Sequence, residues 1–141
     1  MYAALDTKSS VSWNYWRTDG SALPRTSEAG AELDHILALN PSHPGAVHLY
    51  VYLFEASAEP EQALSHADRL ESLMPRKGHM VHMPSHIYIR VGQYEKTIAS
   101  NERSVAAERF FFEQWDDRPF PAEGTYHLSA QTHSPHARYV L

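Results

Sequence analysis

The chain has 141 residues, of which 43% are hydrophobic and 21% are charged, and this composition is typical of a folded globular protein. A formal net charge of -5 and the lack of a basic run argue against a nucleic-acid partner. Cysteine is absent, which excludes disulfides, cysteine-bound zinc and thiol catalysis. Because the sequence shows neither a membrane span nor a signal peptide, we expect a soluble protein. The sequence leaves open the compartment and whether the chain is a segment of a longer protein.

Residues of the same kind recur at a spacing of 34 positions. The recurrences are Pro41 with Pro75, His48 with His82, and Ala29 with Ala63 and Thr97. This period is typical of a repeated helix-turn-helix unit, so we expect an all-α fold of about three units. A period shared by several series in phase is a stronger indication than any one of them.

The first unit is expected to open with a helix that carries Trp13, Tyr15 and Trp16 and ends at Asp19. Residues 21–26 then read as a loop, because a proline at position 24 usually breaks a helix. We expect the second helix to begin near Ser27, which can cap it.

The second unit is expected to hold a helix over residues 46–56, with Ser42 as its cap and Pro44 in its first turn. Pro60 then opens a second helix, which ends before Pro75. The third unit follows with helices over residues 78–91 and 94–110, separated by a turn at Gly92.

The period is lost after residue 112, so we divide the chain into helical repeats over residues 1–112 and an irregular C-terminal segment over residues 113–141. The segment reads as a loop followed by a capping helix. Within the third unit, Pro84 is expected to kink or divide the helix that carries the histidines.

Two segments carry a resemblance to a known family. Residues 43–48 read HPGAVH and residues 78–88 read GHMVHMPSHIY. With the 34-residue period, they resemble the tetratricopeptide repeat (TPR) superfamily, and more narrowly a group of long bacterial TPR proteins of poorly defined function. The resemblance covers about residues 10–110. It implies a right-handed α-solenoid that binds a protein or peptide in its concave groove.

The resemblance also implies which side chains line that groove, because the first helix of each TPR unit faces it. Carried over residue by residue, the groove and partner-binding set is His48, Tyr52, Glu55, His79, His82, His86 and Arg90. Val11, Asn14, Gly45, Ala56 and Ile89 occupy further groove positions. We therefore expect a non-enzymatic binding or assembly module.

A metal site is the alternative for the same residues. Neutral imidazoles are common ligands of zinc, copper and nickel, and His48, His79, His82 and His86 are the candidate ligands. Glu55 could complete such a site, and a metal-bound water would then make hydrolytic activity possible. The bland interpretation is that these imidazoles contact a peptide or pack through hydrogen bonds.

No catalytic residue is assigned. The sequence offers no recognisable nucleophile motif, phosphate loop or metalloprotease motif, which favours a protein that is not an enzyme. Repeat arrays expose apolar ends unless they are capped, so head-to-tail self-association into an oligomer or filament is a further expectation.

Overall fold

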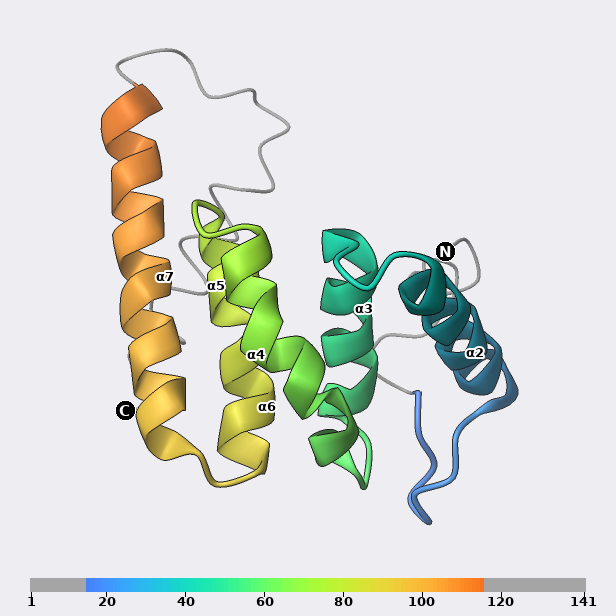
Figure 1. Ribbon diagram of the computed structural model, residues 1–141. Coiled ribbons are helices and arrows are strands. Elements are labelled where there is room, and N and C mark those ends of the chain that lie inside the picture. The colour runs from blue at the N-terminus through green and yellow to red at the C-terminus, as the bar shows by residue number, and fades with distance from the viewer. Residues whose placement is uncertain (1–14, 116–141) are drawn as a thin grey trace.

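A computed structural model describes residues 15–115, and within them the fold is all-α, as predicted. The elements are α2 (Pro24–Leu39), α3 (Pro44–Glu55), the short 3₁₀ helix η1 (Pro60–Ala63), α4 (Leu64–Leu73), α5 (Gly78–His82), α6 (Pro84–Arg90) and α7 (Tyr94–Trp115). The helices stand side by side in a row that runs from α2 at one end to α7 at the other (Figure 1). The described part contains no strand, only an isolated bridge between Trp16 and Ala22.

Each helix packs against its neighbours in this row. α3 contacts α2 and α4, α4 contacts α5 and α6, and these last two contact α7. Apolar side chains fill the successive contacts, and those with at most 2% of their surface exposed include Leu33, Val47, Val51, Leu70, Met83 and Ile87. The core is therefore continuous along the row. Over residues 15–115 no helix is both long and apolar enough to cross a membrane.

The expected helix through Tyr15 and Trp16 is wrong for the described residues. Trp16 lies in the isolated bridge, and its indole nitrogen donates to the carbonyl of Leu53 at 2.9 Å. The backbone carbonyl of Tyr15 accepts a hydrogen bond from the Thr26 hydroxyl at 2.6 Å. These contacts to α3 and α2 hold the segment in a non-helical form, and Trp13 lies outside the described residues.

Two predicted helix starts are also wrong. α2 begins at Pro24, so Ser27 lies within the helix and does not cap it. Proline is well tolerated at the first helical position, where no intrahelical partner is available for an N–H group. The cap of α3 is His43, not Ser42, because the Nδ1 atom of His43 accepts from the Ala46 amide at 3.1 Å.

The third unit begins at Gly78, as predicted, and Pro84 divides its first helix. α5 ends at His82 and α6 begins at Pro84, while Met83 between them keeps helical dihedral angles. α7 continues to Trp115, so the expected boundary after residue 112 falls inside a helix. The expected capping helix lies outside the described residues.

Candidate functional site

The predicted groove residues gather where α3 lies against α5 and α6. His48 contacts His79, and seven residues further along each helix Glu55 contacts His86. Since seven residues make about two helical turns, the two helical segments run in the same direction. We call the set His48, Tyr52, Glu55, His79, His82, His86 and Arg90 the polar seam.

At one end of the polar seam, two imidazoles meet across the helices. The Nε2 atoms of His48 and His79 are 3.0 Å apart, and the ring centroids lie 5.0 Å apart in an edge-on arrangement. Both side chains are half-buried. A hydrogen bond between two ring nitrogens needs one nitrogen protonated and the other not, so the pair fixes one tautomer relative to the other.

At the other end, a chain of hydrogen bonds crosses four helices. Nδ1 of His86 lies 2.9 Å from Oε1 of Glu55, and Nε2 of His86 lies 2.9 Å from Nε2 of His82. Nδ1 of His82 lies 2.7 Å from Oδ1 of Asn101. The chain therefore connects α3, α6, α5 and α7, and it leads from a partly exposed carboxylate into the core.

The direction of these hydrogen bonds follows from the donors available. Oδ1 of Asn101 can only accept, so His82 donates from Nδ1 and accepts at Nε2 from His86. His86 must then also donate from Nδ1 to Glu55, which makes it a positively charged imidazolium beside a carboxylate. If the Asn101 amide turns over, its Nδ2 donates to His82 instead, and both imidazoles can be neutral.

Tyr52 lies next to this chain on α3. Burial raises the pKa of Tyr52 to about 12, with further contributions from Tyr15 and from the charge of Glu55. The rings of Tyr15 and Tyr52 are 6.0 Å apart and edge-on. Oε2 of Glu55 is buried without a hydrogen-bond partner among the described residues. The carboxylate is therefore held between imidazole and phenol groups.

Arg90 closes the polar seam at the end of α3. Its guanidinium donates to the carbonyls of Glu55 at 2.7 Å and Ser57 at 2.8 Å. These carbonyls lie at the C-terminal end of α3, where a cation is favourable. Arg90 thus joins α6 to α3, and its neighbour Ile89 is 38% exposed.

The structure brings all seven predicted residues to one seam but places them at different depths. His82 is only 1% exposed and belongs to the core, where it contacts a surface only through His86. Sequence reasoning missed Asn101. Its signal is a polar residue at the 34-residue position otherwise held by Leu33 and Ala67, both of which are fully buried.

The described side chains do not form a recognisable catalytic or metal centre. No group of three or more His, Asp or Glu residues within 15–115 is arranged to hold a metal ion. The Ser85 hydroxyl lies 3.5 Å from Nδ1 of His82, which already has Asn101 at 2.7 Å, so His82 is poorly placed to activate it. The geometry favours hydrogen bonding and contact over nucleophilic chemistry.

Comparison with known proteins adds no relative. No protein-family model matches the sequence, and neither the curated proteins nor the solved structures contain a match.

Proposed function

We propose that the chain is a TPR-like right-handed solenoid that binds a protein or peptide segment, or a second copy of itself, along the polar seam. The spacing of the elements supports the repeat. α3 and α5 begin 34 residues apart, as do η1 and α7, and α2 and α4 end 34 residues apart.

Burial follows the same period. Ala29, Ala63 and Thr97 have 0%, 0% and 2% of their surface exposed. Val47 and Val81 are likewise 0% and 1% exposed. Equivalent positions therefore meet equivalent packing environments, which is what stacked copies of one unit require.

The polar seam carries the functional part of the proposal. In TPR folds the first helix of each unit faces the concave side, and here those helices are α3 and the α5–α6 pair. His48, His79 and His86 are half-buried and can donate or accept hydrogen bonds. Ile89 supplies exposed apolar surface beside them. Mixed apolar and hydrogen-bonding surface of this kind suits an extended peptide.

The test is a selection of peptides from a displayed library on the whole chain, followed by affinity measurements by titration calorimetry. Ile89→Asp should weaken a selected peptide about tenfold or more, because a charge replaces its apolar contact. Ile98→Asp is the matched control, since Ile98 on α7 is 39% exposed, outside the seam. Equal losses in the two variants, or no selectable peptide, would contradict the proposal.

A second pair of measurements separates contact from metal binding. His79→Gln should weaken a bound peptide only modestly, because glutamine keeps part of the hydrogen bonding, whereas a metal site would lose its ligand. Peptide affinity should also be the same with and without a chelator. Stoichiometric zinc, copper or nickel that is lost in His82→Ala would overturn the contact proposal in favour of a metal site.

Self-association is tested separately by sedimentation velocity. A dimer or filament that dissociates in Ile89→Asp and persists in Ile98→Asp would identify the partner as a second copy. A monodisperse monomer at high concentration would exclude that branch and leave a foreign peptide as the partner.

A further inference from the structure

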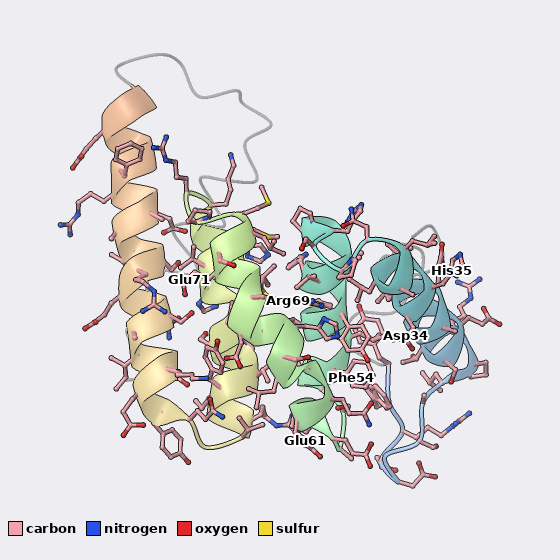
Figure 2. The ribbon with its side chains drawn as sticks, viewed as in Figure 1. Asp34, His35, Phe54, Glu61, Arg69 and Glu71 are labelled. Carbon is pink, nitrogen blue, oxygen red and sulfur yellow. The ribbon has the colours of Figure 1, made fainter. Side chains whose placement is uncertain are left out.

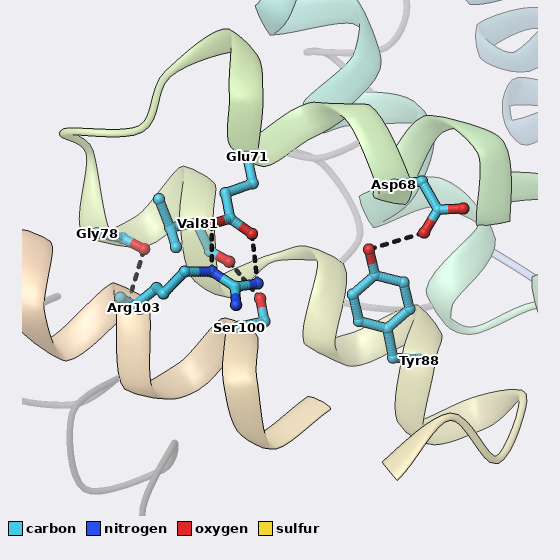
Figure 3. Close-up of polar contacts among 8 residues, drawn as sticks. Asp68, Glu71, Gly78, Val81, Tyr88, Ser100 and Arg103 are labelled. Atoms are coloured by element: carbon cyan, nitrogen blue, oxygen red, sulfur yellow. Dashed lines mark hydrogen bonds and ion pairs between the residues drawn. The ribbon is translucent and has the colours of Figure 1, made fainter. Parts of the chain in front are cut away.

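A second surface emerges when equivalent interfaces are compared. Where α4 meets α6 and α7, the Tyr88 hydroxyl donates to Asp68 at 3.0 Å and the Lys96 ammonium lies 2.8 Å from the same carboxylate. Arg103 forms a two-pronged ion pair with Glu71, in which Nη2 lies 2.7 Å from Oε2. Figure 3 shows the tyrosine contact and this ion pair. Every charge in this interface has a partner of opposite sign.

The same positions one repeat earlier, where α4 meets α2 and α3, keep two of the charges and lose their partners. Asp34 stands for Asp68 and Arg69 stands for Arg103, each 34 residues earlier. In place of the three partners Tyr88, Lys96 and Glu71, the chain has Phe54, Gln62 and Leu37. None of these replacements can neutralise a charge.

Arg69 is accordingly left with a neutral neighbour. The guanidinium of this half-buried side chain lies 2.6 Å, through Nη2, from Nδ1 of His66, which must be unprotonated to accept the bond. Burial and the charge of Arg69 both lower the pKa of His66, so His66 stays neutral. Nε of Arg69 is buried without a hydrogen-bond partner among residues 15–115. One guanidinium bond to an imidazole leaves most of its five donors unused.

The surroundings of Arg69 are aromatic on one side and acidic on the other. The Tyr50 ring lies 4.2 Å from the His66 ring and stacks on Phe54 at 4.6 Å. Asp34 projects from α2 towards the same place, as Figure 2 shows, and its charge acts on both Tyr50 and His66. No ion pair within the described residues joins Asp34 to Arg69.

We propose that Arg69 receives a glutamate or aspartate side chain of a protein partner, which takes the place that Glu71 holds against Arg103 in the next repeat. A guanidinium offers paired N–H donors in a plane that matches a carboxylate. The half-exposed edges of Phe54 and His66 can cover the aliphatic part of that side chain. Because the whole chain carries a net charge of -5, its long-range field repels an acidic segment, so binding depends on these local donors.

The probe is a fluorescently labelled hexaglutamate peptide, titrated into the full chain, with hexaglutamine as the uncharged comparison. Arg69→Gln should weaken binding about tenfold or more, because it removes the paired donors. Arg103→Gln is the matched control, since it removes the same charge from an arginine that already has a carboxylate partner. Asp34→Asn should tighten binding, because it removes a like charge near the bound carboxylate.

Further variants keep the result interpretable. Arg69→Lys retains the charge and should still weaken binding, since a single ammonium cannot form the two-pronged contact. His79→Gln in the polar seam should leave hexaglutamate binding unchanged, which separates this surface from the proposed peptide seam. Circular dichroism confirms that each variant is folded.

Two outcomes would overturn the inference. The first is equal weakening by Arg69→Gln and Arg103→Gln, or no binding to the parent chain. The second is acetate or glutarate competing at the concentration of the peptide, which would identify a site for a small carboxylate and not a protein surface.

Discussion

The two interfaces of α4 use the same positions and different chemistry. Towards α2 and α3 the contact is aromatic, with Trp16 packed on Phe54 at 5.7 Å and Phe54 stacked on Tyr50 at 4.6 Å. Towards α6 and α7 the corresponding space holds hydrogen bonds and ion pairs, including the one from Ser100 to the Val81 carbonyl at 2.5 Å. One helical frame thus accepts either solution.

The difference shows that the backbone period and the interface chemistry are set independently. Small and apolar residues at the 34-residue positions fix where helices approach, as at Ala63 and Ala67, which are fully buried. The side chains around them then decide whether an interface is sealed by rings or by charges. A sealed ring interface tolerates an unpaired charge only at its edge, which is where Arg69 lies.

The largest effect is expected from a side chain that belongs to both interfaces. Leu70 on α4 is fully buried, and Leu70→Ala should lower the free energy of unfolding by about 2–5 kcal/mol, because it removes burial and leaves a cavity. Urea titration measures this loss. Leu39→Ala, at a leucine that is 75% exposed, should change little and serves as the control. Equal losses would contradict the assignment of the core.

The polar interface should break at its buried end. Asn101→Ala leaves Nδ1 of His82 without its partner in the core, and it should cost about 1–3 kcal/mol of unfolding free energy. The neighbouring Glu102 is exposed, so Glu102→Ala controls for the change in the helix. A loss no greater than that of the control would show that the buried chain of hydrogen bonds adds no stability.

The aromatic interface should show a pH dependence through His66. Its pKa is lowered in the folded chain, whereas the unfolded value is about 6.5. Below that pH the unfolded state binds the proton more readily, so stability is present above about pH 6.5 and is lost as the pH falls through the lowered folded pKa. His66→Gln should remove this part of the decline in urea titrations at several pH values. The exposed His35→Gln should leave it in place.

The smallest effect comes from making one interface resemble the other. Gln62→Lys places a lysine opposite Asp34, as Lys96 lies opposite Asp68, and should add about 0.2–1 kcal/mol because the pair is exposed. Thermal unfolding at low and high salt measures the gain, which salt should reduce. In an Asp34→Asn background the gain should vanish, and its persistence there would refute the equivalence of the two positions.

Much of the fold could be predicted because the 34-residue period controls burial, and Pro60 and Gly78 mark helix starts by their local backbone preferences. The first segment could not be predicted, since Trp16 satisfies its indole through Leu53, 37 positions away. The helix starts at Pro24 and after His43 were missed because proline reads as a breaker and histidine is an unusual cap.

The candidate site was predicted in its membership but not in its connections. A repeat pattern places His48, His79 and His86 on one side of their helices, yet it cannot show that His82 is buried or that Asn101 completes the chain. Those features depend on how closely α5 and α7 approach, which depends on side-chain packing throughout the row.

The central claim is that the polar seam is the surface that a partner contacts, and side-chain NMR of the histidines tests it most directly. On addition of a selected peptide, the account predicts that the imidazole signals of His48, His79 and His86 shift strongly while those of the exposed His35 on α2 stay unchanged. Shifts confined to His35 or to the outer side of α7, with the seam imidazoles unchanged, would contradict it.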